Sequence, residues 1–217
     1  MPGTVAEDFE IQLERGHSGG FPPAGDFGGG DGDGRPNAIP RRAYMTGITM
    51  ALAAIMMFFM ALTSSYIVRR GTGTDWHAIA LPRVLWANTL VLLASSVTLE
   101  LARRQLANGA MAAFRNLWSL TTALGLLFVG GQLIAWKQLR AAGVFLSSNP
   151  SSSFFYLFTA AHGLHLLGGI VALLYVAYRS WQRARTTQAV AAEVTAVYWH
   201  FLDGLWVFLF LLFSLGR

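Results

Sequence analysis

Five long apolar runs follow one another from residue 43 to residue 215, and shorter polar segments separate them. Each run is close to the roughly 20 residues that a helix needs to cross a bilayer. Glycine, serine and threonine are scattered within the runs, whereas a barrel strand would alternate polar and apolar residues over a shorter span. The pattern therefore predicts an all-α membrane protein, a bundle of five transmembrane helices at about 43–68, 82–102, 117–136, 154–178 and 196–215.

The segment before the first apolar run has a different composition. Residues 1–40 are rich in glycine, proline and aspartate, and residues 28–34 read GGGDGDG. Such a segment cannot bury enough apolar surface to offset the entropy of ordering the chain. We expect a disordered tail at 1–40 and a transmembrane helical domain at 41–217. No cleavable signal peptide is recognisable, so the first helix is expected to serve as the targeting signal.

Composition supports the membrane assignment. Hydrophobic residues make up 54% and charged residues 12% of the 217 residues, which is too apolar for an ordinary soluble domain. The net charge of +5 comes from arginines that flank the apolar runs. This placement is typical of the ends of transmembrane helices and argues against a nucleic-acid-binding surface. The absence of cysteine excludes disulfides, iron–sulfur clusters and thiolate-bound haem within this chain.

The flanking charges predict an orientation. With Arg15 left out, nine arginines lie on the side of the N-terminus and six lysines and arginines lie on the other side. The positive-inside rule then places the N-terminus in the cytoplasm and the C-terminus outside. Tryptophans at or near the ends of the apolar runs are expected to anchor the helices at the membrane interfaces: Trp76, Trp86, Trp118, Trp136 and Trp181.

The last apolar run contains two ionisable residues. His200 and Asp203 lie three positions apart, and Glu193 precedes His200 by seven, so one helical face can present all three. Ionisable groups inside a membrane are costly, and they usually face protein or water. Two interpretations stay open: a proton-conducting chain, and a static polar network that ties the last helix to its neighbours or to another subunit. The sequence favours the static network.

Two histidines lie in the fourth run. His162 and His165 are surrounded by the small residues Ala161, Gly168 and Gly169, which allow neighbouring helices to approach closely. We expect these histidines to form hydrogen bonds across a tight helix interface. Haem or metal ligation is the alternative, although His165 lies roughly 20 Å and His200 only about 6 Å from the cytoplasmic ends of their helices. A single porphyrin would not easily join ligands at such different depths.

Other polar residues have simpler explanations. Glu100 precedes Arg103 and Arg104 and is expected to form an ion pair with them, and residues 71–74 (GTGT) are expected to form the turn after the first helix. The chain has no G-x-S-x-G motif, no H-E-x-x-H motif and no phosphate-binding loop. We therefore expect no catalytic, cofactor-binding or metal-binding residues in this chain.

Three segments resemble a known family. Residues 198–210 (YWHFLDGLWVFLF) resemble the closing signature of cytochrome c oxidase subunit III. Residues 153–169 (SFFYLFTAAHGLHLLGG) resemble the penultimate helix of that family, and residues 88–98 (NTLVLLASSVT) resemble the start of an earlier helix. Order and spacing agree over about 44–213. Long members have seven helices, and because the similarity starts at the third, the chain resembles the short five-helix bacterial form.

The resemblance implies a non-catalytic subunit of a respiratory haem–copper oxidase in a bacterial inner membrane. Such a subunit would pack beside subunits I and II, which would hold the haem and copper, and would stabilise the catalytic subunit and support proton uptake in a proton-pumping complex. It also implies contact with membrane lipids, bound phospholipid among them, and leaves a respiratory supercomplex open. The polar residues carried over as structural contacts are His162, His165, Glu193, His200 and Asp203.

One position departs from the family pattern. Many members have a glutamate before a Val-Met-Phe-Phe-like run, and this chain has Ile55 there. A role for that carboxylate in proton or lipid handling therefore cannot be transferred. The remaining alternatives are subunit III of a quinol oxidase, a related nitric oxide reductase subunit and, from other classes, a b-type haem membrane anchor or a transporter.

Overall fold

The computed structural model describes residues 41–72, 82–146, 149–182 and 185–215, so the predicted disordered tail lies outside the described residues. Five long helices make up nearly all of the described chain, and each contains a window long and apolar enough to cross a membrane. The predicted all-α fold with five spans is confirmed. The helices are α2 (Arg41–Thr72), α3 (Val84–Ala107), α4 (Met111–Ala141), α5 (Pro150–Trp181) and α6 (Arg185–Leu215).

Most helices extend beyond the apolar runs that predicted them. The largest difference is in α6, which begins at Arg185, well before the predicted start at 196, so Glu193 lies within α6 and not before it. At the end of α2, Gly71 and Thr72 are still helical, and the other two residues of the predicted GTGT turn lie outside the description. Hydropathy marks only the part of a helix inside hydrocarbon, while backbone hydrogen bonding continues into the polar interface.

Local chemistry explains two of the helix boundaries. The side chain of Asn149 accepts a hydrogen bond from the Ser152 backbone N–H at 3.0 Å, and the Ser152 hydroxyl accepts one from the Asn149 N–H at 3.2 Å. This capping box, followed by Pro150 in the first turn, starts α5. Gly109, with a φ of 74°, lies in the short turn between α3 and α4, and this turn lets the two helices run antiparallel.

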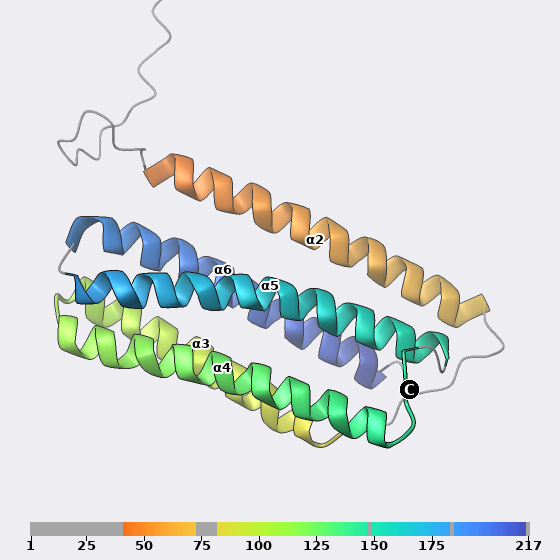
Figure 1. Cartoon of the computed structure of the whole chain (residues 1–217). Coiled ribbons are helices and arrows are strands. Elements are labelled where there is room, and N and C mark those ends of the chain that lie inside the picture. Colours follow the sequence, from red (N-terminus) through yellow and green to blue (C-terminus); the bar gives the residue numbers. More distant parts are fainter. Residues whose placement is uncertain (1–40, 73–81, 147–148, 183–184, 216–217) are drawn as a thin grey trace, which may run out of the picture. The chain divides into compact units, whose positions relative to one another are not determined.

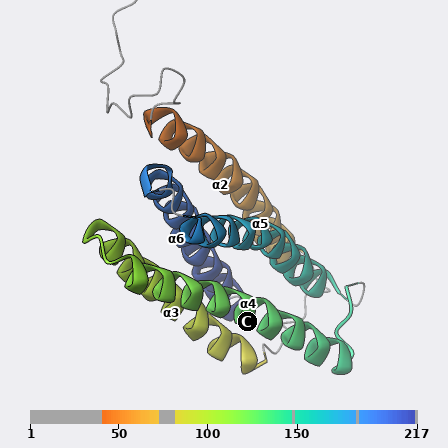
Figure 2. The ribbon, with the colours of Figure 1, turned by 60° about the vertical axis from the view of Figure 1, so that its left-hand side comes forward.

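The five helices do not contribute equally to the packing. In the described part of the chain, α3 packs along α4, α4 contacts α5, and α6 contacts α2, α3 and α5, whereas α2 contacts only α5 and α6. Figures 1 and 2 show α2 on the outer side of α5 and α6, away from α3 and α4. Only 6% of the apolar window of α2 is buried, against 33–44% in the other four helices. The outer faces of α2 therefore lie against lipid or another protein.

Aromatic side chains join α2 to the rest of the bundle. The ring of Tyr66 contacts Phe154 and Phe158 of α5 and Phe213 of α6, with centroid distances of 5.7–6.2 Å and near-perpendicular planes. Such edge-to-face pairs each add of order 1 kcal/mol to the apolar burial. This cluster fixes the C-terminal half of α2, while an ion pair described below fixes its N-terminal end.

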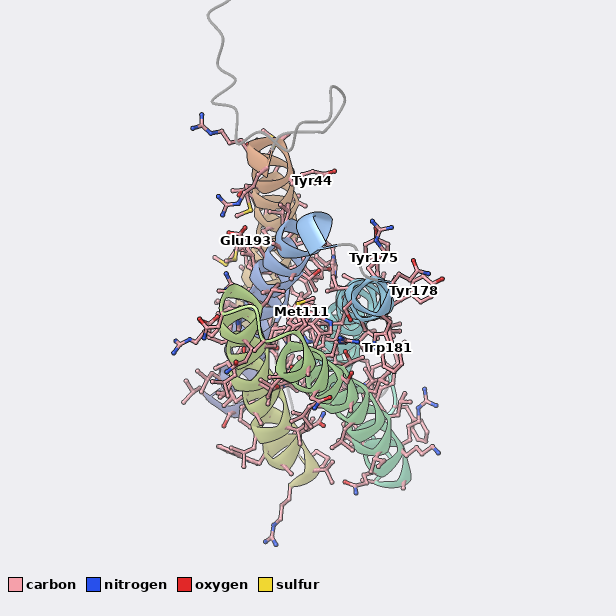
Figure 3. All side chains as sticks on the ribbon, turned by 90° about the vertical axis from the view of Figure 1, so that its left-hand side faces the viewer. Tyr44, Met111, Tyr175, Tyr178, Trp181 and Glu193 are labelled. Atoms are coloured by element: carbon pink, nitrogen blue, oxygen red, sulfur yellow. The ribbon has the colours of Figure 1, made fainter. Side chains whose placement is uncertain are left out.

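The predicted tryptophan anchors fall into two groups. Trp86 and Trp181 are 58% and 71% exposed, as interfacial anchors would be. Figure 3 shows Trp181 with Tyr175 and Tyr178 projecting from the end of α5 away from the bundle. Trp118, however, is fully buried, and its indole N–H donates to the Leu173 carbonyl of α5 at 2.9 Å. The anchor prediction is wrong for Trp118, because α4 begins at Met111, about two turns before it. Trp76 lies outside the described residues.

Candidate functional site

A row of polar side chains joins α3 to α6 inside the bundle; we call it the α3–α6 seam. It consists of Thr89, Ser95 and Ser96 of α3 and Trp199, His200, Asp203 and Trp206 of α6. Small hydroxyl side chains on α3 let α6 approach closely and also provide hydrogen-bonding groups. The seam is the largest group of polar contacts between helices in the described structure.

Ser96 is at the centre of the seam. Its hydroxyl donates to Asp203 Oδ2 at 2.5 Å, and its oxygen lies 2.7 Å from Nδ1 of His200. A serine hydroxyl has one hydrogen, so when that hydrogen is given to Asp203 the oxygen must accept from a protonated Nδ1 of His200. One serine therefore holds both ionisable groups of the predicted pair and selects the tautomer of the histidine.

Burial differs between the two ionisable side chains. Asp203 is only 4% exposed, and its second carboxyl oxygen, Oδ1, has no hydrogen-bond partner in the described part of the chain. His200 is half-buried, at the edge of the seam. A second protein could therefore reach His200 without rearrangement of the bundle, whereas Asp203 is enclosed by its own chain.

Two tryptophans complete the seam. The indole N–H of Trp199 donates to Ser95 Oγ at 3.0 Å, and that of Trp206 donates to Thr89 Oγ1 at 3.1 Å. The Trp199 ring is fully buried between helices, since a Cβ atom at Gly125 of α4 or at Gly169 of α5 would meet it at 2.7 Å and 3.2 Å. These contacts were not predicted from the sequence; the signal for them was the helical spacing of Thr89, Ser95 and Ser96 in an apolar run.

Glu193 pairs with a different helix. Its carboxylate receives two hydrogen bonds from Arg41, one from Nε at 2.9 Å and one from Nη2, and so ties the start of α6 to the first residue of α2. Figure 3 shows Glu193 on α6, below the first turns of α2. The predicted stripe of Glu193, His200 and Asp203 thus divides, with Glu193 paired to α2 and the other two to α3. The predicted ion pair of Glu100 with Arg103 and Arg104 is confirmed, at 3.2 Å for each N–O distance.

The two histidines of α5 differ from the prediction. His162 is buried between the rings of Phe128 and Trp206, and neither ring nitrogen has a hydrogen-bond partner in the described part of the chain. His165 places Nδ1 2.8 Å from the Ala161 carbonyl of its own helix, and its ring contacts Phe58 and Phe59 of α2. The expected hydrogen bond to a neighbouring helix is thus wrong for His162, since no polar atom of the described residues lies within hydrogen-bonding distance of its ring nitrogens.

The close helix approach predicted around these histidines is present. A Cβ atom on Gly169 would lie 3.2–3.3 Å from the rings of Trp199 and Tyr198, and the Tyr198 hydroxyl donates to the backbone carbonyl of His165 at 3.0 Å. Haem ligation by His162 would require these packed helices to separate, since protein encloses both of its nitrogens. Among the described residues, no three His, Cys, Asp or Glu side chains are grouped as metal ligands.

Comparison with known proteins gives the family. A model of the family "Cytochrome c oxidase subunit III" matches residues 34–215. The chain belongs to the cytochrome c oxidase subunit III family. It is 33% identical over 181 residues to a probable cytochrome c oxidase subunit 3 of Mycobacterium tuberculosis, covering 81% of this chain and 87% of that protein.

Other relatives agree with this. A cytochrome c oxidase subunit 3 of Corynebacterium diphtheriae is 32% identical over 185 residues, 82% of this chain and 87% of the relative. One of Synechocystis is 29% identical over 174 residues, 77% and 73% of the two chains. The resemblance found in the sequence is therefore confirmed. The chain is a multi-pass membrane subunit of cytochrome c oxidase, in a family that has no catalytic site of its own, and this replaces the haem-anchor and transporter alternatives.

Proposed function

We propose that this subunit stabilises the catalytic subunit of cytochrome c oxidase and thereby supports proton uptake by the complex. The observation that carries the proposal is the α3–α6 seam, in which one serine holds a buried carboxyl group and an imidazole. Hydrocarbon provides no hydrogen-bond partners, so polar groups that satisfy each other across two helices hold those helices in one register. A bundle stiffened in this way is suited to support a neighbouring subunit.

The edge of the seam contains the residue that we expect to contact another subunit. His200 is half-buried and its Nδ1 faces Ser96, so the other edge of its ring is the part of the seam that a partner subunit or water can reach. We assign the contacts between subunits to His200, and the contacts within the chain to Asp203, Glu193, His162 and His165. The partners are subunits I and II, which carry the haem and copper, together with membrane phospholipid.

The topology belongs to the same proposal. Arg41, Arg42, Arg103, Arg104, Arg115 and Arg179 lie at the helix ends on the N-terminal side. The positive-inside rule places this side in the cytoplasm of a bacterium, with the subunit in the inner membrane. The catalytic subunit would then take up protons from the side at which Arg41 and Glu193 join α2 to α6.

Affinity purification of the tagged chain from native membranes in mild detergent tests the assembly. We expect to recover a large haem–copper subunit with a-type absorption and a copper-binding subunit II beside it. Additional recovery of a cytochrome c-reducing complex would extend the proposal to a supercomplex. Recovery of the chain alone from membranes whose oxidase remains intact and active would overturn the proposal.

Two substitutions at Asp203 separate a static network from a proton-conducting chain. Asp203→Asn keeps a carbonyl oxygen that can accept from Ser96, whereas Asp203→Leu removes every acceptor. If the seam is static, the Asn variant keeps proton uptake over many turnovers, and the Leu variant loses subunit III from the complex. Loss of proton uptake in the Asn variant with subunit III still bound would contradict the static seam and favour proton conduction.

A further inference from the structure

Two polar side chains that are not part of the α3–α6 seam are enclosed by the bundle without hydrogen-bond partners among the described residues. Gln132 of α4 is 8% exposed and His162 of α5 is 1% exposed. In the described part of the chain, neither the amide nitrogen and oxygen of Gln132 nor the two ring nitrogens of His162 have a partner. Buried polar groups of native proteins nearly always have one, and the surrounding lipid provides none.

The helix register brings these two side chains to the same level. The indole N–H of Trp136 on α4 donates to Thr159 Oγ1 on α5 at 3.2 Å, so these two positions lie opposite each other. The helices α4 and α5 lie side by side and run antiparallel (Figure 1). Gln132 lies one turn before Trp136 on α4, and His162 lies one turn after Thr159 on α5. The antiparallel register therefore places Gln132 opposite His162.

The neighbouring contacts agree with this register. The ring of Phe128, one turn from Gln132 on α4, lies 6.3 Å from the His162 ring. The ring of Trp206 on α6 covers another side of His162 at a centroid distance of 5.2 Å. Two sides of the His162 ring thus face aromatic rings, and neither of these two contacts involves a charged side chain.

We propose that Gln132 and His162 form an internal water-binding site between α4 and α5, in which a bound water molecule bridges the amide and the imidazole. A neutral imidazole has one donor and one acceptor, and an amide has both kinds of group. Water can donate two hydrogen bonds and accept two, so a single molecule can satisfy an atom on each side chain. This site shares only the Trp206 ring with the α3–α6 seam, and it does not include His200, the residue proposed to contact another subunit.

The first test is a cryo-electron-microscopy map of the intact oxidase at a resolution that shows ordered water. We expect density within hydrogen-bonding distance of both the Gln132 amide and the His162 ring. A direct bond between the amide and the ring, or the two side chains without shared density, would overturn the proposal.

Substitutions provide a second test that needs no map. Gln132→Leu and His162→Phe each leave the other polar group without its bridge, so each should shorten the half-life of subunit III on the complex in detergent by about five- to tenfold. The double variant leaves neither polar group behind, so its half-life should be shortened no more than that of either single variant. Gln138→Leu, at an exposed position on the same helix, is the control and should leave the half-life unchanged. Additive losses in the double variant would show that the residues share no site.

Discussion

At the scale of single residues, close contact between helices depends on glycines that face bulky or polar side chains. Asn88 of α3 donates its amide N–H to the Phe128 carbonyl of α4 at 3.0 Å. This bond is possible because Gly131, one turn further along α4, has no side chain, and a Cβ atom there would overlap the Asn88 amide. One missing methyl group thus allows a buried amide to satisfy a backbone carbonyl of the neighbouring helix.

Substitution of Gly131 by alanine should therefore destabilise the α3–α4 pair. The added methyl group displaces the Asn88 side chain and breaks its hydrogen bond to Phe128, at a cost of about 1–3 kcal/mol. This cost is measured by heating the purified oxidase and monitoring the dissociation of subunit III as a function of temperature. Gly130→Ala is the matched control, because a Cβ atom at Gly130 has no neighbour within 4 Å in this chain. Equal stability of the two variants would contradict the explanation.

Some residues of the site could be predicted from the sequence and others could not. The pair His200 and Asp203 stood out because an ionisable residue in an apolar run is costly wherever the helix packs. Ser96 did not stand out, since serine is common in membrane helices and only the register between α3 and α6 shows that it joins both groups. Trp118 was predicted to lie at the membrane interface because it is near the end of an apolar run, but it is buried, because the helix continues beyond that run.

At the scale of helices, α2 is held by a few contacts at separated positions. At its N-terminus, Arg41 binds the Glu193 carboxylate through two nitrogens, and in its C-terminal half Tyr66 contacts three aromatic rings. Between these points, Phe59 stacks on Phe158 of α5. Hydropathy could predict that α2 spans the membrane, but not its partners, because lipid and protein accept the same apolar faces.

Removal of the charge on Glu193 should loosen the first turns of α2. We expect Glu193→Gln to raise hydrogen–deuterium exchange in the N-terminal part of α2 by about two- to fivefold, a modest change because the Arg41 side chain is half exposed. Mass spectrometry of the intact oxidase in lipid nanodiscs measures this exchange. The control is Glu100→Gln, which breaks ion pairs within α3 alone and should leave α2 unchanged. Unchanged exchange in Glu193→Gln would show that the ion pair does not hold α2.

At the scale of the whole molecule, the helices alternate in direction, so successive turns lie on opposite sides of the membrane. The α3–α4 turn contains Asn108 and Gly109, and α4 ends at Ala141, followed by Ala142 and Gly143. Asn108 and Ala142 are both exposed. The orientation predicted from arginines places Asn108 in the cytoplasm and Ala142 outside.

Cysteine labelling tests this orientation directly, because the chain contains no cysteine of its own. A membrane-impermeant maleimide applied to intact spheroplasts should label Ala142→Cys and leave Asn108→Cys unlabelled until the cells are lysed. Gel mobility of the tagged subunit after labelling reports the result. The opposite labelling pattern would reverse the topology and place Arg41 and Glu193 outside the cell.

The peripheral position of α2 has a consequence for how the subunit is made. Arg41 and Glu193 are 152 positions apart in the chain, and every helix that α2 contacts in the described structure comes after α4. During synthesis, α3 and α4 can pair as soon as both have entered the bilayer, since a short turn joins them. Helix α2, which precedes α3, must instead wait in the lipid for α5 and α6, and so it joins the bundle only after α6 has been synthesised.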